Sequence, residues 1–274
     1  VYFEPLTYQY FYPEYKDLTP SQRQYPKDWM KEFDEMMSSS SFKDKKVGYP
    51  NYINIGSFID MFVLNEFSKG IDSYMFSTYF YKENDSDGGK LNAGPPWDYN
   101  LSLGNIDYGQ NQRYPYDWVY DNWSRVYWFK RLMEDPIYEN EVFGRWDSLR
   151  MNVYSEENIF GIIDSTVSHL GNAIDRNYNR YPILGMYVWP NQWYPDTYEE
   201  EIVKMKDWIH ERLVWMDQKL ANQYDPSLSS LSLSMTPSYS SIQMYPNPSN
   251  FKDLTIQIKG DSDTKTFTVK LFNS

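Results

Sequence analysis

The sequence predicts a mainly α (α+β) protein in which one β-hairpin lies inside a helical region and a small β segment follows near the C-terminus. Three patterns predict this class. Helix-capping residues precede apolar residues at three- and four-residue spacing, a Gly-rich turn joins two short strand-like segments, and polar and apolar residues alternate near the C-terminus. At 274 residues the chain can form one large core, or one core with a small appendage.

Two helices precede the hairpin. The run from Thr19 to Gln22 is a capping box with proline at the first helical position, which predicts a helix to about Met37. Asn54 caps a second helix that ends near Lys69. Its apolar residues fall on one face at helical spacing: Ile55, Ile59, Phe62, Val63 and Phe67.

The hairpin lies between two aspartates. Residues 78–82 and 90–93 are predicted strands, and the Asp- and Gly-rich residues 85–89 favour a turn between them. A hairpin returns the chain to the edge where it began. We therefore expect the carboxylates of Asp72 and Asp98 to lie close together at the mouth of one cleft.

The region after the hairpin is helical in pattern. Helices are predicted over residues 123–134, 137–152 and, after the cap Ser155, 156–177. The run from Asp196 to Glu199 resembles a capping box and starts a long last helix. Its apolar stripe comprises Ile202, Met205, Ile209, Leu213, Met216 and Leu220.

A boundary is predicted near residue 223. Residues 1–222 form the helical domain, 223–241 are Ser- and Pro-rich and typical of a linker, and 242–274 alternate as β-strands do. This last part resembles the start of the sorting domain of type IX secretion, truncated after two or three strands. The resemblance implies that the protein is secreted or held at the cell surface.

Composition excludes several classes of function. The net charge of −12 disfavours nucleic acid as a partner, and no apolar run is long enough to span a membrane. The chain has no cysteine, and its only histidines are His169 and His210, so thiolate sites and histidine-rich metal sites are excluded. Chemistry must come from carboxylates, amides and hydroxyls.

The order of Asp72, hairpin and Asp98 is the layout by which protein kinases place a catalytic aspartate beside a magnesium-binding one. Phosphoryl transfer needs one carboxylate to orient the acceptor hydroxyl and another to hold the metal. We assign Asp72 to the first role and Asp98 to the second, with Asn100 or Ser77 as a further oxygen donor. The alternative for Asp72 is a turn residue that makes only local hydrogen bonds.

Two blocks, residues 65–82 with Tyr74 and Lys82, and residues 94–105 with Trp97 and Asp98, resemble the CotH family of atypical kinases related to spore coat protein H. The resemblance implies a kinase-like C-lobe, the cofactors ATP and Mg²⁺, and transfer of phosphoryl from ATP to a hydroxyl of a protein substrate. It covers about residues 19–221.

The chain departs from the family pattern at three positions. Ser77 stands where many members have a metal-binding Asn, Met75 where the resembling branch has Arg, and Gly70 where it has Asn. The nucleotide-clasping N-lobe should precede Val1. We therefore expect this chain to be inactive alone, with its nucleotide-binding residues outside it.

The rival hypothesis is a non-catalytic cell-surface module. Aromatic residues make up 19% of the chain and gather at residues 114–118 and 187–194, where they could stack on glycans or bind a protein. The simpler interpretation, which we favour, is that these rings pack against the helices.

Overall fold

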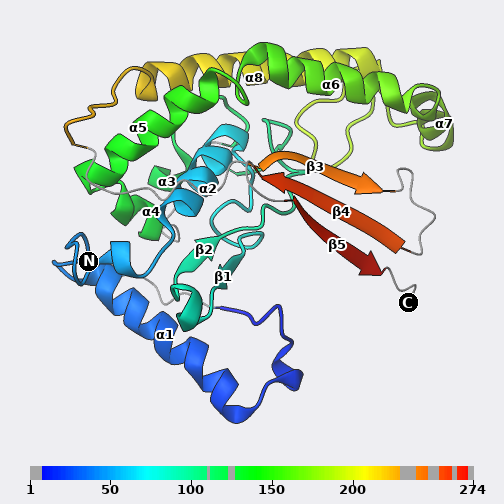
Figure 1. The fold of residues 1–274 in the computed structure, drawn as a ribbon. Helices are drawn as coiled ribbons and strands as arrows, with labels where there is room; N and C mark the ends of the chain where they lie inside the picture. Colours follow the sequence, from blue (N-terminus) through cyan, green and yellow to red (C-terminus); the bar gives the residue numbers. More distant parts are fainter. Residues whose placement is uncertain are drawn as a thin grey trace. The chain divides into compact units, whose positions relative to one another are not determined.

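The computed structural model describes residues 8–109, 112–122 and 127–228, together with strands at 239–245, 253–260 and 264–270. The chain divides into two units, Val1–Leu231 and Ser232–Ser274, which are described separately. The first unit is helical with one embedded two-stranded hairpin, so the predicted fold class is confirmed (Figure 1).

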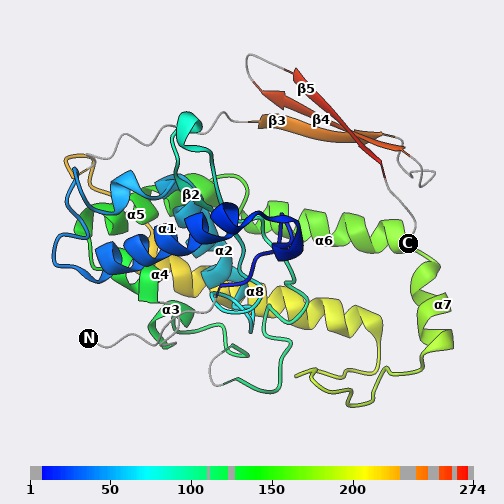
Figure 2. The ribbon, with the colours of Figure 1, turned by 90° about the horizontal axis from the view of Figure 1, so that it is seen from below.

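The first unit is built around α2 (Ile55–Ser68), which packs against α5, β2, α3 and α8. Both of its faces are buried, whereas the sequence pattern predicted one. α6 and α8 run alongside each other in Figures 1 and 2. The other elements are α1 (Pro20–Ser38), β1 (Phe80–Lys82), β2 (Leu91–Ala93), α3 (Val119–Asn122), α4 (Tyr127–Leu132), α5 (Pro136–Arg150), α6 (Glu156–Leu170), α7 (Ala173–Arg180) and α8 (Tyr198–Leu220), with 3₁₀ turns at Tyr15–Asp17, Tyr49–Asn51 and Asp85–Asp87.

The predicted helix starts are confirmed at the atomic level. Thr19 Oγ1 accepts a hydrogen bond from Gln22 N (3.3 Å), and Thr19 N donates to Gln22 Oε1 (2.9 Å), which completes the capping box. Asn54, Ser155 and Thr197 each accept a hydrogen bond from a first-turn backbone amide of the helix that follows. These caps satisfy amides that have no partner within a helix.

The middle helices differ from the prediction in two places. The helix predicted over 156–177 is divided at Gly171, whose φ of 45° ends α6 before α7 begins. Glycine adopts this conformation with little strain and therefore favours a helix end. The helix predicted from residue 123 is preceded by α3, which begins at Val119, and residues 123–126 lie outside the described part.

Aromatic rings fill much of the core between α1, α2 and α4. Phe33 meets Trp128 edge-on at a centroid distance of 4.8 Å, and Phe58 stacks on Phe129 at 5.5 Å. All four side chains are buried, and such ring pairs add to the stabilisation from buried apolar area.

An ionic cluster lies at the centre of this unit. Glu66 of α2 and Arg212 of α8 are both fully buried, with Oε2 and Nη2 3.6 Å apart. The Glu66 carboxylate accepts hydrogen bonds from Tyr74 Oη (2.8 Å), Val119 N (2.8 Å) and Tyr120 N (3.0 Å). Burial raises the pKa of Glu66, while Arg212 and these donors act to lower it.

The second unit is an antiparallel sheet in the order β3 (Tyr239–Tyr245), β4 (Asp253–Gly260), β5 (Thr264–Lys270). Leu254 pairs with Val269 and Ile256 with Phe267, so the predicted alternating apolar residues stand opposite one another. Leu271 and much of the predicted linker lie outside the described residues. Within the described residues, no helix combines the length and apolarity needed to span a membrane.

Replacing Arg212 with Met should lower the free energy of unfolding by about 3–5 kcal/mol, because it leaves Glu66 buried without its counter-charge. The loss should shrink as pH falls, since Glu66 without Arg212 has a folded-state pKa above its unfolded value and protonation then favours the folded state. Urea unfolding at several pH values measures this. A further Glu66→Gln substitution should restore part of the stability; no recovery would contradict this account.

Deleting residues 232–274 should leave the melting temperature of the first unit nearly unchanged, because the two units are compact separately. The cut must spare Asp225, whose backbone N and O bond to the Asn140 side chain on α5 at 2.7 and 3.0 Å. Calorimetry of the shortened and full chains checks this. A marked drop in melting temperature would show that the sheet stabilises the helical unit.

Candidate active site

The segment that carries Asp72 leaves α2 through an unusual helix end. Lys69, the C-cap, has left-handed dihedrals (φ 49°, ψ 39°) and its N–H donates to Asn65 O. The chain beyond it is tied to the segment after Asp98: Ile71 N donates to Leu101 O (3.0 Å) and Leu103 N to Ser68 O (2.7 Å). These backbone bonds bring the two acidic segments together.

The hairpin supplies the other connection. β1 and β2 pair antiparallel with Phe80 opposite Ala93, and Gly94 N donates to Tyr79 O (2.8 Å). Backbone bonds from Leu91 N to Tyr52 O and from Asn54 N to Leu91 O, both 2.8 Å, attach β2 to the start of α2. The start of β2 is thus fixed to the residues that lead into α2.

Asp72 and Asp98 interact electrostatically. Partial burial raises the pKa of the half-buried Asp72, and the negative charge of Asp98 raises it further. Asp98 is exposed, and its Oδ2 accepts a hydrogen bond from Ser77 Oγ at 3.1 Å. Two carboxylates and one hydroxyl therefore converge from the two predicted blocks.

Asp98 is held in a strained backbone conformation, with φ of 66°. Aspartate tolerates this left-handed region better than most residues, and such strain occurs frequently at functional sites. The preceding Trp97 is largely exposed and makes an edge contact with Tyr79. Asn100 lies exposed two positions beyond Asp98.

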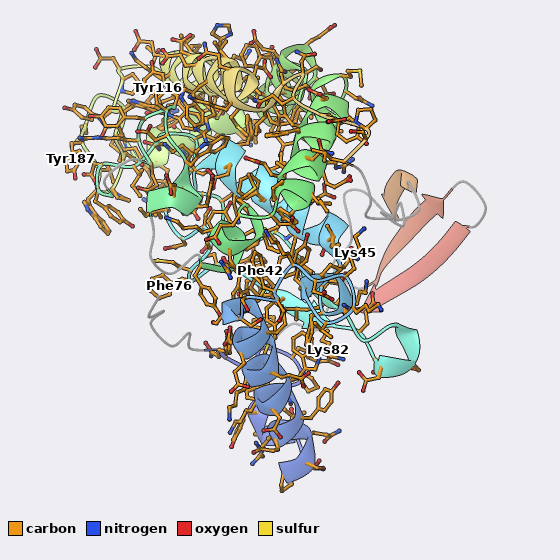
Figure 3. The ribbon with its side chains drawn as sticks, turned by 90° about the vertical axis from the view of Figure 1, so that its left-hand side faces the viewer. Phe42, Lys45, Phe76, Lys82, Tyr116 and Tyr187 are labelled. Carbon is orange, nitrogen blue, oxygen red and sulfur yellow. The ribbon has the colours of Figure 1, made fainter. Side chains whose placement is uncertain are left out.

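Polar side chains connect the two blocks that carry Asp72 and Asp98 to α2. Tyr99 Oη donates to Asn65 Oδ1 (2.7 Å), and Tyr74 contacts Glu66, so both blocks rest on α2. Glycine at position 70 is explained by lack of space, because a Cβ there would lie 2.9 Å from the buried Ser73 Oγ. Lys82 is mostly covered, donates to Asp85 (2.7 Å) and lies over the Tyr25 ring, which is a packing role (Figure 3).

The oxygen donors suit a hard cation such as Mg²⁺, which typically takes one or two protein carboxylates and completes its shell with water and phosphate oxygens. Asp98 and Ser77 meet directly, and Asp72 is near enough to interact with Asp98. In the part of the chain that the structure describes, no three His, Cys, Asp or Glu side chains form a metal-binding group. The contact between the Asp98 carboxylate and the Ser77 hydroxyl supplies oxygen donors of the kind that Mg²⁺ takes.

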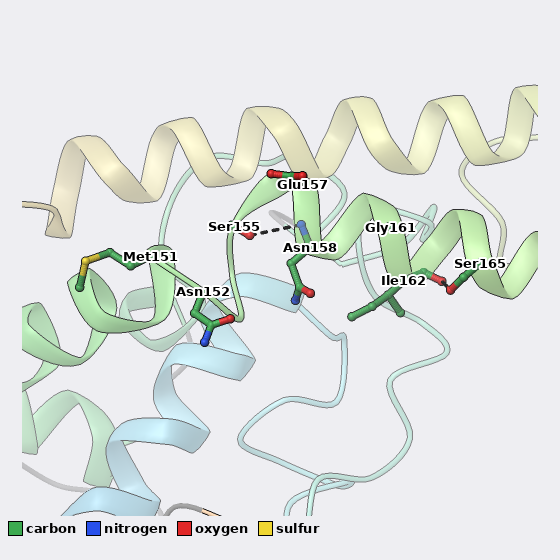
Figure 4. A pocket seen from close by; sticks show the side chains of 8 residues that line it. All are labelled: Met151, Asn152, Ser155, Glu157, Asn158, Gly161, Ile162 and Ser165. Atoms are coloured by element: carbon green, nitrogen blue, oxygen red, sulfur yellow. Dashed lines mark hydrogen bonds between the residues drawn. The ribbon is translucent and has the colours of Figure 1, made fainter. Parts of the chain in front are cut away.

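A hollow in the surface lies elsewhere, at the connection between α5 and α6. Figure 4 shows its lining, which includes none of Asp72, Ser77, Asp98 or Asn100. The lining residues are Met151, Asn152, Ser155, Glu157, Asn158, Gly161, Ile162 and Ser165. It is therefore separate from the carboxylate pair.

The aromatic runs have mixed environments. Trp118 packs edge-on against Trp215 at 4.7 Å, as a core ring does. Trp189 is 67% exposed and stacks on Tyr108 at 5.6 Å with an interplanar angle of 12°. Tyr187 and Tyr194 are also exposed and meet edge-on at 6.0 Å.

Two features of the site were not predicted from the sequence. Lys69 was interpreted only as the end of a helix, yet its side chain is buried. Arg212 lies far from Glu66 in sequence, on α8. The apolar stripe of this helix predicts a buried face but not that a charged side chain belongs to it. A lysine at a helix end followed by Gly was the available signal for Lys69; none existed for the pairing with Arg212.

Comparison with known proteins agrees with the resemblance in the two acidic blocks. The model of a family described as CotH kinase protein matches residues 3–216. No curated protein and no solved structure shows significant similarity to the chain. Since the match spans most of the chain and includes both acidic blocks, the chain belongs to the CotH kinase family.

Proposed function

We propose that the protein is an atypical protein kinase that transfers the γ-phosphoryl group of ATP to a hydroxyl of a protein substrate. The observation that carries this proposal is that backbone hydrogen bonds join the segments of Asp72 and Asp98, so that the two carboxylates repel each other, in a chain of a kinase family. Positioning and electrostatic stabilisation provide most of the catalysis in phosphoryl transfer. A rigidly attached carboxylate pair is suited to that task.

Asp72 would accept and orient the hydroxyl of the substrate. Its raised pKa makes the carboxylate a better proton acceptor than an ordinary aspartate. Because Asp72 follows the tied segment at residues 68–71, its position is set by the backbone of α2.

Asp98 would hold Mg²⁺, with Ser77 and Asn100 as further oxygen donors. The cation would bridge and neutralise the phosphate oxygens of ATP. The hydrogen bond from Ser77 and the constrained backbone at Asp98 fix the direction of the carboxylate before any ligand arrives. Such preorganisation avoids reorientation during the reaction.

One observation favours a second candidate, a surface module that binds glycans or proteins. Tyr108 and Trp189 form an exposed parallel stack, and such rings suit contact with the apolar face of a sugar. This role would require no carboxylate pair. The resemblance of the C-terminal sheet to a sorting domain supports secretion or attachment to the cell surface under either candidate.

Substituting the two aspartates should separate binding from transfer. In the full-length protein, with its nucleotide-binding N-lobe, Asp98→Asn should abolish magnesium-dependent ATP binding in calorimetry, whereas Asp72→Asn should bind ATP normally and lower the transfer rate by about 10²–10⁴-fold. Asp207→Asn, an exposed residue on α8, is the matched control. Equal ATP affinity of wild type and Asp98→Asn in magnesium would overturn the metal role and favour the surface module.

The interaction between the acids can be measured without activity. In Asp98→Asn the pKa of Asp72 should fall, because the neighbouring negative charge is removed, but it should stay above the ordinary value because burial remains. Carboxyl ¹³C NMR titration reports the change. An unchanged Asp72 pKa would show that the carboxylates are too far apart to serve one site.

A further inference from the structure

Lys69 occupies a costly position. It is fully buried, and its backbone is in the left-handed region that favours glycine at a helix end. Burying an amine and straining the backbone both oppose folding. Lys69 is buried and strained directly before the Asp72 segment. Contacts of its side chain must therefore offset these two unfavourable contributions to folding.

The side chain of Lys69 reaches the loop at residues 114–117. Its Nζ donates to the carbonyl oxygens of Tyr114 (2.8 Å) and Tyr116. Arg212 donates to the two alternate carbonyls, those of Pro115 and Asp117, both at 2.9 Å. Four consecutive carbonyls are thus held in turn by two buried basic side chains, one at the end of α2 and one on α8.

The outer side of this loop is exposed. Tyr114 and Tyr116 are each 48% exposed, and Tyr116 Oη donates to Glu211 Oε2 at 2.8 Å. Lys69 therefore joins two segments: the one leading into Asp72 by the backbone, and the 114–117 loop by its amine.

We propose that Lys69 is a positioning residue whose buried amine ties the 114–117 loop to the segment that carries Asp72. This deepens the proposed function and rests on it only for the role of Asp72. The tie fixes the C-terminal end of α2, so that residues 70–72 start from one defined direction. A misplacement of about 1 Å can cost roughly 10²-fold in rate.

The number of donors explains how this tie responds to pH. A neutral amine has two N–H groups, which match the two carbonyl acceptors, while an ammonium has a third and adds charge beside Arg212. Burial, then the positive charge of Arg212, lowers the pKa of Lys69 to about 7, against opposite effects of Glu66 and Asp117. These three groups are the charged neighbours that α2, α8 and the loop present to the amine.

The direction of the pH effect follows from the difference in the pKa of Lys69 between the open and the closed loop. In an opened loop Lys69 meets water and regains a high pKa, so protonation favours the open form and loss of the proton favours the closed one. Between pH 6 and pH 8 the closed loop should therefore gain about tenfold in population relative to the open loop.

Hydrogen exchange with mass spectrometry tests the proposal. In the wild-type chain, protection factors of the amides of residues 112–114 and 116–118, corrected for intrinsic exchange, should rise about tenfold from pH 6 to pH 8. In Lys69→Met, protection of these amides at pH 8 should fall about tenfold or more, because two hydrogen bonds are lost, and it should no longer depend on pH. Lys204→Met, an exposed residue of α8, is the matched control.

Activity provides the second readout. In the full-length protein, with dephosphorylated casein as acceptor probe, Lys69→Met should lower kcat and leave KM for magnesium-ATP unchanged, as expected when only the acceptor-orienting group is displaced. A Lys69→Met chain with wild-type exchange and kcat would overturn the proposal, and so would a wild-type chain with flat protection across this pH range. The exchange measurement on the wild type at several pH values needs no substitution. It therefore tests the role of Lys69 even if the Lys69→Met variant does not fold. A full-length wild type, with its nucleotide-binding N-lobe, that transfers no phosphoryl overturns the proposed function, while the exchange result still decides whether Lys69 holds the 114–117 loop.

Discussion

The burial of charge on α2 is the constraint on which the rest of the first unit depends. Glu66 has no access to water, so its carboxylate must be satisfied by Arg212, by Tyr74 and by the backbone at Val119 and Tyr120. Each of these partners belongs to a different segment. The requirement of one carboxylate therefore determines where the last helix, the Asp72 segment and the start of α3 must lie.

The acidic site is built on this framework and not on flexible loops. Backbone bonds at residues 68–71 and 101–103 connect the two blocks directly, while Tyr74 and Tyr99 fasten them to α2 from below. The acids themselves differ in environment: Asp72 is half-buried and Asp98 is exposed. This asymmetry separates a group suited to handling a proton from one open to a hydrated cation.

Local features were predictable from the sequence, and distant ones were not. The caps at Thr19, Asn54 and Ser155 depend on neighbours a few residues away, and all three were predicted. For the last helix the predicted box began at Asp196, one residue before the observed cap Thr197. The hairpin was also predicted, because its turn residues lie between its strands. The contacts of Arg212 and the burial of Lys69 depend on how segments fold back on α2, which no pattern along the chain encodes. The division at Gly171 was missed because the apolar pattern continues across it.

The tight contact at Gly70 has an evolutionary consequence. The space that a side chain at this position would need is taken by the hydroxyl of Ser73. A larger residue at 70, such as the Asn of the resembling branch, requires that residue 73 lose its hydroxyl or turn it elsewhere. The two positions should therefore covary among relatives.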